Sequence, residues 1–377
     1  MSTPTTATAR TAPARRATPS AVQSVWLVTE REIGSKLRSK AFVVSTLLLL
    51  LLPLVALVWA GIAATNVQTT HVAATPELAS TVSGVGGITV TTADSADAAI
   101  AMVKDGTVEA AVVPADTADG PYPYKIVAKD SYPETLVATL SVAPQVQLLE
   151  ENPQNALLRY FVAIGFGVVF LMAASMFGGT IAQSVVEEKQ TRVVELLISA
   201  IPVRMLLAGK VLGNTILAMA QILALAAIAF VGLTVSGQSL ALTGLGGPVV
   251  WFAVFFFFGF VLLASLFAAA GAMVSRQEDI GSTTTPLTML ILAPYLLVIF
   301  FNDNPVVLAV MSYVPFSAPV AMPLRIYLGQ VSWWEPVLSL AILVGTCLAA
   351  ILVGARIYEN SLLRMGARVT LKEALRA

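Results

Sequence analysis

Charged residues are scarce in this sequence of 377 amino acids. They make up 12% of the chain, whereas hydrophobic residues make up 57% and the mean hydropathy is +0.82. A water-soluble domain has about 25% charged residues, so this chain has too little polar surface to be one. Several apolar runs reach the ~18 residues with which a helix crosses a bilayer, where the backbone must satisfy its own hydrogen bonds. The sequence therefore predicts an all-α polytopic membrane protein.

Side chains suited to catalysis or metal binding are also few. The single cysteine, Cys347, lies in an apolar run, which excludes an intrachain disulfide and a cysteine metal cluster, and we expect it to be a packing residue. The single histidine, His71, belongs to no HExxH motif, and no serine lies in a GxSxG motif. We therefore expect no catalytic residue, no metal site and no bound cofactor.

A P-loop is absent as well. The glycine-rich stretch GLGGPVV at 244–250 lacks the lysine of a G-x-x-x-x-G-K-S/T motif and leads into an apolar run. The chain is therefore not expected to hydrolyse ATP itself.

Six apolar runs have the length of membrane spans. Residues 1–20 before them are rich in Thr, Ala, Pro and Arg and are predicted to be a disordered tail. Residues 21–40 alternate apolar and charged positions at helical spacing and include Trp26, which predicts an amphipathic helix at the membrane interface. We interpret the first span as a retained signal anchor, because this leader is too long for a cleavable signal peptide. The predicted spans are 41–64, 157–181, 210–234, 248–274, 283–301 and 336–357.

The segment 65–156, between the first two spans, is polar. Within it, ITVTT alternates like a strand, ADSADAAIAMVKDG has an Asp start, helical spacing and a Gly stop, and VEAAVVP is typical of a second strand. A small α/β domain is therefore predicted between the first and second spans. A second interruption, 302–335, has four prolines separated by apolar pieces too short to span, which favours a re-entrant segment within the membrane region 157–357.

The distribution of lysine and arginine predicts the orientation. Of 22 basic residues, 17 fall in the four segments that six spans would place on one side, and cytoplasmic loops carry such an excess. We expect both termini, including the tail 358–377, to be cytoplasmic and 65–156 to lie outside, in a multi-pass protein of the plasma membrane. The four basic segments are 1–40, 182–210, 275–282 and 356–377.

A charged stretch, VVEEKQTRVVELLISAIP, interrupts the membrane region within the cytoplasmic loop 182–210. We expect a single cytoplasmic helix here, with Glu188 and Arg192 four residues apart and able to pair. A helix with one apolar and one charged face can lie on the bilayer or present its charges to a soluble partner, and the residues alone leave both open. Its charged residues are Glu187, Glu188, Lys189, Arg192 and Glu195.

Ionisable residues are missing from the middle of the predicted spans, which argues against an ion-coupled secondary transporter. A few polar side chains remain there. Hydrogen bonding between helices explains these side chains. The alternative is a functional role, in which they line a substrate path. These residues are Ser175, Thr180, Asn214 and Gln221.

Four motifs in order resemble a known family. EEKQTRVVELLISAIPVRMLLAGKVLG at 187–213 is similar to the first cytoplasmic loop of type-2 ABC exporter membrane subunits, and more narrowly to the NatB-like sodium-export permease branch. TEREIGSKLRSKAF at 29–42, PFSAPVAMPLRIYLG at 315–329 and ARIYENSLLRMGARVTLKEALR at 355–376 match other segments of that family. The resemblance spans nearly the whole chain, although Gln190 and Thr191 depart from the family's commoner EEK-Ser pattern.

The resemblance implies an ATP-driven exporter. The charged loop would be a coupling helix that docks on a separate ATP-binding subunit, which holds ATP and Mg, and the loop with Arg276, Glu278 and Asp279 would be a second contact. A second permease chain, identical or a paralogue, would complete the pathway. The implied cargo is sodium, and a drug, peptide or lipid remains an alternative. A different functional class also remains open. The chain could be a membrane sensor or an assembly scaffold that uses the external domain and transports nothing.

Overall fold

The computed structural model describes residues 20–65, 70–83, 88–115, 123–129, 136–137, 140, 156–191, 193–235, 244–362 and 370–376. The chain divides into two compact units. The helical unit comprises Met1–Leu57 with Gln154–Ala377, and the α/β unit comprises Val58–Pro153.

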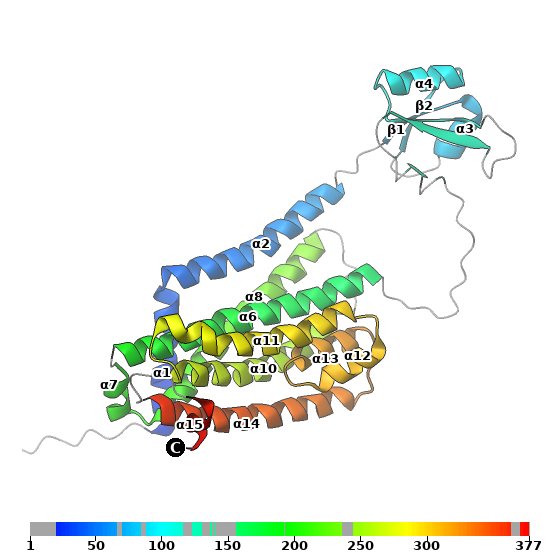
Figure 1. Cartoon of the computed structure of the whole chain (residues 1–377). Coiled ribbons are helices and arrows are strands. Elements are labelled where there is room, and N and C mark those ends of the chain that lie inside the picture. The colour runs from blue at the N-terminus through cyan, green and yellow to red at the C-terminus, as the bar shows by residue number, and fades with distance from the viewer. Residues whose placement is uncertain are drawn as a thin grey trace, which may run out of the picture. The chain divides into compact units, whose positions relative to one another are not determined.

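The helical unit contains long apolar helices connected by short segments (Figure 1). Within the described residues, five helices are long and apolar enough to cross a membrane, and the pair α1 and α2, bent by 75°, makes a sixth candidate. This confirms the prediction of a polytopic helical protein. The helices are α1 (Ala21–Arg38), α2 (Lys40–Thr65), α6 (Ala156–Gln190), α7 (Val193–Ala200), α8 (Val203–Val235), α10 (Gly246–Ala272), η1 (Gln277–Asp279), α11 (Ile280–Phe300), α12 (Pro305–Tyr313), α13 (Ala318–Tyr327), α14 (Glu335–Leu362) and α15 (Leu371–Arg376).

The central helix of the bundle is α10, which contacts α6, α8, α11, α13 and α14. Phenylalanines one helical turn apart on α6 and α10 interlock. Phe166 stacks on Phe252 at 4.8 Å between ring centroids, and Phe170 meets Phe256 edge to face at 5.7 Å. Such ring pairs contribute about 0.5–1.5 kcal/mol beyond the area that they bury, so this contact holds the two helices in one register.

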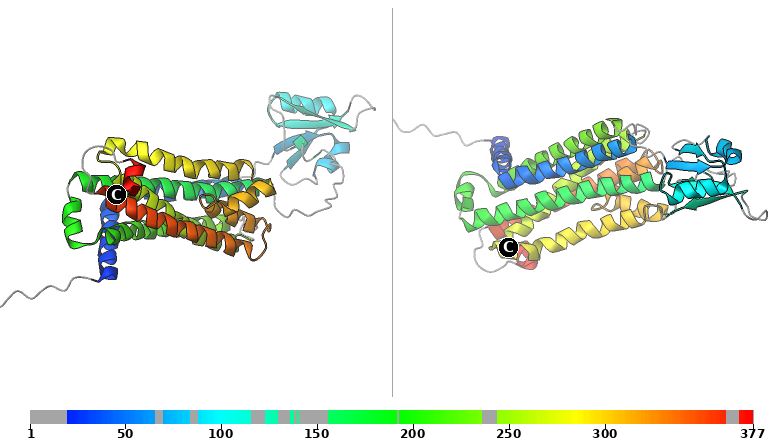
Figure 2. Two further views of the ribbon diagram at one scale, coloured as in Figure 1. Left: turned by 60° about the horizontal axis from the view of Figure 1, so that its bottom comes forward. Right: turned by 90° about the horizontal axis from the view of Figure 1, so that it is seen from above.

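The two ends of the bundle differ in construction. At one end lie α7, α15 and α1, and α1 runs across the bundle rather than along it (Figures 1 and 2). The helix predicted over 21–40 is present as α1, and the capping box that Ser20 and Gln23 form gives it a defined start. At the other end, α12 and α13 form a short helical hairpin against the bundle.

An ion pair fixes the hairpin to the start of α14. Nη2 of Arg325 lies 2.8 Å from Oε2 of Glu335, and its Nη1 donates to Oγ of Ser312 at 2.9 Å. The hydroxyl of Tyr313 donates to the same Glu335 oxygen at 3.1 Å. The segment predicted as re-entrant is therefore two packed helices whose buried arginine has its partners within the same end of the bundle.

The α/β unit contains one four-stranded sheet with the order β2-β1-β3-β4. The strand β1 pairs in parallel with β2 and β3, and β3 pairs antiparallel with β4. The β-α-β element predicted from the sequence is confirmed as β2, α4 and β3. The elements are β1 (Thr70–Ala74), α3 (Pro76–Ser83), β2 (Ile88–Thr92), α4 (Ala96–Lys104), β3 (Ala110–Pro114) and β4 (Tyr124–Ala128).

The charged stretch does not form the single helix that the sequence predicted. Helix α6 continues for 35 residues to Gln190, through the predicted end of the span at 181, and a separate short helix, α7, begins at Val193. The apolar residues Val185 and Val186 are fully buried in the bundle core, which extends α6 past the predicted membrane boundary. Glu187, Glu188 and Lys189 therefore belong to the last turn of α6, and Glu195 belongs to α7.

Candidate functional site

Three consecutive residues at the end of α6, Glu188, Lys189 and Gln190, contact different parts of the helical unit. We call them the α6 junction. Successive residues of a helix point about 100° apart, so adjacent side chains reach separate neighbours. Together they connect α6 to α1, α8, α10, α14 and the loop before η1.

Glu188 belongs to a partly buried ionic network with α1 and α8, in which Arg31 is the exposed member. Its carboxylate pairs with Arg31, and its Oε2 lies 3.0 Å from Nζ of Lys210. Lys210 is fully buried, and its Nζ also donates to Oε1 of Glu32 at 2.9 Å and to Oγ of Ser184 at 3.1 Å. The buried Lys210 therefore has two buried carboxylate partners, and the exposed Arg31 balances the second of them, so the buried charges are paired.

Lys189 joins the ends of two helices. Its side chain is fully buried, and its Nζ donates to the carbonyl oxygens of Ala272 and Ser361, at 2.9 Å in each case. Ala272 is the last residue of α10, and Ser361 lies in the last turn of α14. The final carbonyls of a helix lack intrahelical partners and carry partial negative charge, so an ammonium group is well placed between two such ends.

Gln190 ties α6 to the loop before η1. Its Nε2 donates to the carbonyl oxygen of Ser275 at 3.2 Å. That loop continues into an exposed ion pair, Arg276 with Glu278, at 3.2 Å. The two segments with exposed charges, separated by about 80 residues in the sequence, are thus connected at one end of the bundle.

Close contact between α1 and α8 positions the network. A Cβ atom on Gly209 would lie 2.5 Å from Cβ of Val28, and one on Gly213 would lie 3.0 Å from Cβ of Glu32. Oγ1 of Thr29 donates to the carbonyl oxygen of Gly209 at 3.2 Å. Two glycines four residues apart on α8 therefore let α1 approach closely enough for Glu32 to reach Lys210.

Lys36 lies one turn beyond Glu32 on α1, at the edge of the network. Burial lowers the pKa of its ammonium group, the carboxylates of Glu32 and Glu187 oppose this shift, and Lys210 adds to it. The charged form of Lys36 is therefore less favourable at this position than in water.

Exposed side chains surround the α6 junction at the same end of the unit. On α7, Leu196 is 73% exposed although its type is usually buried, and Glu195 beside it is exposed. Because α7 and η1 both contact α6, these side chains form one surface, which we call the charged end face. Its members are Glu187, Glu195, Leu196, Arg276, Glu278 and Asp279.

A family model described as "ABC-2 family transporter protein" matches residues 40–356. The chain belongs to this family. It is 30% identical over 231 residues to the uncharacterized protein YhaP of Bacillus subtilis, covering 56% of this chain and 55% of that protein. It is 28% identical over 230 residues to the uncharacterized protein MJ1024 of Methanocaldococcus jannaschii, covering 59% of this chain and 55% of that protein.

The chain spans about half the length of these curated relatives. No solved structure matches. The ABC-2 match includes α6 to α13 and most of α14, and therefore the whole α6 junction, but it begins after Arg31 and Glu32.

The structure separates the predicted coupling residues of this ABC-2 protein into two groups. Glu187, Glu195 and the three charges of the η1 loop are exposed, whereas Glu188 and Lys189 are buried. Arg192, the predicted partner of Glu188, lies outside the described residues. Among the described residues, Glu188 pairs with Arg31 and Lys210.

The predicted polar residues of the spans have different environments. Asn214 and Gln221 are buried on one face of α8, and among the described residues neither side-chain oxygen has a hydrogen-bond partner. Thr180 donates to the carbonyl oxygen of Phe177 in its own helix at 2.9 Å, as expected for a packing residue. Ser175 is half-buried on α6.

The sequence analysis did not identify Arg31 and Glu32 as members of the site, because it treated them only as charged positions of the interfacial helix 21–40. The available signal was Gly209, Gly213 and Lys210, a glycine pair spaced for close helix contact with a lysine inside an apolar segment.

Proposed function

We propose that this ABC-2 protein is the membrane-spanning permease subunit of an ATP-driven exporter, powered by a separate ATP-binding subunit. The observation that carries the proposal is the α6 junction. Three adjacent residues behind an exposed charged surface contact α1, α8, α10 and α14, so a displacement of that surface is transmitted to the whole bundle.

The charged end face is the proposed docking surface for the ATP-binding subunit. It combines exposed charges with the exposed apolar side chain of Leu196, the mixture that protein interfaces use for specificity and affinity. In the proposed orientation this end is cytoplasmic, where ATP and Mg are available to the partner, both termini lie on that side, and the α/β unit lies outside the plasma membrane.

The pathway is proposed to form between two permease chains, identical or paralogous. The five spans of the helical unit carry their charged residues only near their ends, so no ionisable side chain is available at mid-span to couple transport to an ion gradient. This supports ATP as the energy source.

Sodium is the cargo that the NatB-like resemblance favours. Buried polar oxygens of Asn214 and Gln221 are compatible with a cation, while the apolar bundle suits a drug, peptide or lipid. Measurement of sodium and dye efflux from vesicles that contain the assembled complex distinguishes these cargoes.

The test is purification of the tagged full-length chain from its own membranes in mild detergent, with mass spectrometry of the proteins that accompany it. We expect a P-loop ATPase in stoichiometric amount. The double substitution Glu195→Lys with Leu196→Glu changes only exposed side chains, and it should reduce the recovered ATPase by about tenfold or more, the effect of losing one strong interface residue.

Lys372→Glu is the matched control, because Lys372 is an exposed charge on α15, outside the charged end face. It should leave ATPase recovery unchanged. If no ATPase accompanies the wild-type chain at any detergent concentration, the permease proposal is wrong. The alternative is a sensor or scaffold that acts through the α/β unit. It would then be tested by a search for molecules that bind this unit.

A further inference from the structure

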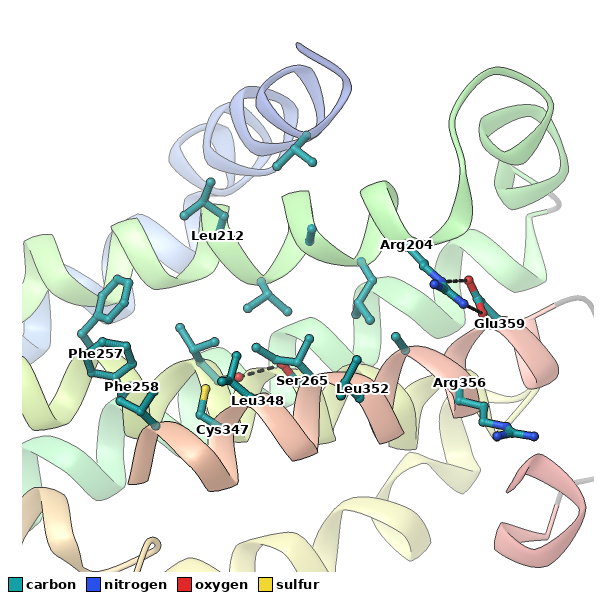
Figure 3. A pocket seen from close by; sticks show the side chains of 18 of the residues that line it. Arg204, Leu212, Phe257, Phe258, Ser265, Cys347, Leu348, Leu352, Arg356 and Glu359 are labelled. Atoms are coloured by element: carbon teal, nitrogen blue, oxygen red, sulfur yellow. Dashed lines mark hydrogen bonds and ion pairs between the residues drawn. The ribbon is translucent and has the colours of Figure 1, made fainter. Parts of the chain in front are cut away.

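A long cavity lies on the helical unit between α8, α10 and α14 (Figure 3), and Val25 of α1 also lines it. Its volume is about 820 Å³. One stripe of each helix lines it, with positions three or four residues apart such as Leu207 and Val211 on α8 and Leu348 and Leu352 on α14. The cavity therefore runs along the helices and not across them.

The length of this cavity resembles that of a lipid chain. Lining residues on α14 extend from Val344 to Asn360, which is roughly 24 Å at the helical rise of about 1.5 Å per residue. One leaflet of hydrocarbon is about 15 Å thick, half of the ~30 Å core. The groove is therefore long enough to hold an acyl chain of one leaflet, whereas a compact solute would leave much of it empty.

Charge is confined to one end of the cavity. Arg204 and Glu359 form a bidentate pair there, with Nε to Oε1 at 2.7 Å and Nη2 to Oε2 at 3.3 Å. Arg356 is exposed at the same end, and its guanidinium has no ion pair with another described residue (Figure 3). Phe257 and Phe258 lie at the opposite end (Figure 3).

Between its two ends, the described lining of the cavity is apolar apart from the thiol of Cys347 and the hydroxyl group of Ser265. The one hydroxyl group among its lining residues, on Ser265, donates to the carbonyl oxygen of Val261 at 2.8 Å. At the charged end, two guanidinium groups and one carboxylate give a net charge of about +1, which favours an anion. An apolar body with one cationic end matches a molecule with an apolar chain and an anionic head.

We propose that this cavity binds one anionic phospholipid, with an acyl chain along α8 and α14 and its phosphate on Arg356 and Arg204. Basic pockets between membrane helices recognise such headgroups, and guanidinium groups suit phosphate oxygens. In the orientation proposed above, the lipid comes from the cytoplasmic leaflet. The inference requires only that the chain lies in a membrane, so it stands apart from the proposed transport activity.

The bound lipid would strengthen the packing of α8 on α14. Each of these helices also contacts the α6 junction. Lys210 on α8 pairs with Glu188, and the carbonyl oxygen of Ser361 on α14 accepts from Lys189. A lipid that fills the space between α8 and α14 holds Lys210 and Ser361 at a fixed separation. Its loss should loosen α8 against α14 without breaking the ion pairs themselves.

The first test is native mass spectrometry of the full-length chain in detergent, with dioleoyl phosphatidylglycerol or dioleoyl phosphatidylcholine added. We expect one retained phosphatidylglycerol and markedly less phosphatidylcholine. Arg356→Gln should lower phosphatidylglycerol retention about fivefold, the factor equivalent to ~1 kcal/mol for one basic residue at an anionic membrane surface. Arg204→Gln should act in the same direction.

Glu359→Gln provides a test with the opposite sign. It removes the carboxylate that neutralises Arg204, so it should raise phosphatidylglycerol retention. Lys372→Gln removes an exposed cation that does not line the cavity and should have no effect. Equal retention by wild type, Arg356→Gln and Glu359→Gln would overturn the proposal, as would equal binding of the two lipids.

A photocrosslinking amino acid in place of Leu348 identifies the occupant in intact membranes. Leu348 lines the cavity and is 58% exposed, so this position tolerates a larger side chain. A phosphatidylglycerol adduct on the chain supports the proposal. A crosslink to a second polypeptide, or only to neutral lipid, would show that another molecule covers the groove.

Discussion

At the residue scale, Glu187 and Glu188 are adjacent on α6 but have opposite environments. Glu187 is exposed, whereas Glu188 is 9% exposed and pairs with Arg31 and Lys210. A buried ion pair adds little net stability, but removal of one partner leaves the other charge without compensation in a low dielectric. The sequence alone does not distinguish the two carboxylates, but in the folded chain one is exposed and the other is buried.

This difference predicts different effects for two conservative substitutions. Glu188→Gln should destabilise the helical unit by roughly 1–3 kcal/mol, because it takes one charged partner from the buried Lys210, which keeps Glu32. Glu187→Gln should change stability by less than about 0.5 kcal/mol, as surface substitutions usually do. Thermal unfolding of both variants in the same detergent compares them, and equal melting temperatures would contradict the burial of Glu188.

At the element scale, α1 depends on the glycines of α8. Gly209 lies against Cβ of Val28 at a distance that no added Cβ could occupy without a shift of the helix. The α1 helix carries two of the four charges of the network, Arg31 and Glu32. Its position on α8 therefore decides whether Lys210 and Glu188 find their partners.

Gly209→Ala should displace α1 from α8. The added methyl would lie 2.5 Å from Cβ of Val28 and 2.9 Å from the carbonyl oxygen of Val25. Hydrogen exchange of the amides of α1 should increase, because the helix loses its packing surface. Gly345→Ala on α14 is the matched control, since nothing lies within 4 Å of its added Cβ and alanine favours a helix by about 1 kcal/mol. Unchanged exchange in Gly209→Ala would show that α1 packs differently.

Periodicity predicted the individual elements well. The apolar runs became the long helices, and the β-α-β element formed where strand alternation and helix signals indicated it. The predicted end of this span, residue 181, was wrong. The last turns of α6 are stabilised by tertiary contacts, which local hydropathy does not encode. The ion pair of Glu188 with Arg31 joins residues 157 apart in the sequence and for the same reason could not be derived from spacing.

At the scale of the whole molecule, the two units have separate hydrophobic cores. In the α/β unit, alternate residues of β3 serve the two faces of the sheet, with Ala111 and Val113 in one cluster and Ala110 and Val112 in the other. The core of the helical unit includes none of these residues. Separate cores imply that one unit can lose its structure while the other keeps it.

Val113→Asp tests this separation in the full-length chain. Val113 is fully buried, so an aspartate there should unfold the α/β unit, since a buried charge without a partner is strongly destabilising. Hydrogen exchange should increase across 70–128 and stay unchanged across 156–362. Thr91→Asp, at an exposed position of β2, should leave both regions protected. Increased exchange in both regions would show that the two units unfold together.

The α6 junction also constrains how the sequence can change in length. One residue inserted into α6 near Ala182 would turn the following residues by about 100° and advance them by about 1.5 Å. Glu188, Lys189 and Gln190 would then all leave their partners at once, although no side chain had been replaced. An insertion or deletion there is therefore far more damaging than a point substitution. Related chains should vary in the length of their loops while the number of residues between the Phe166 contact and the junction stays constant.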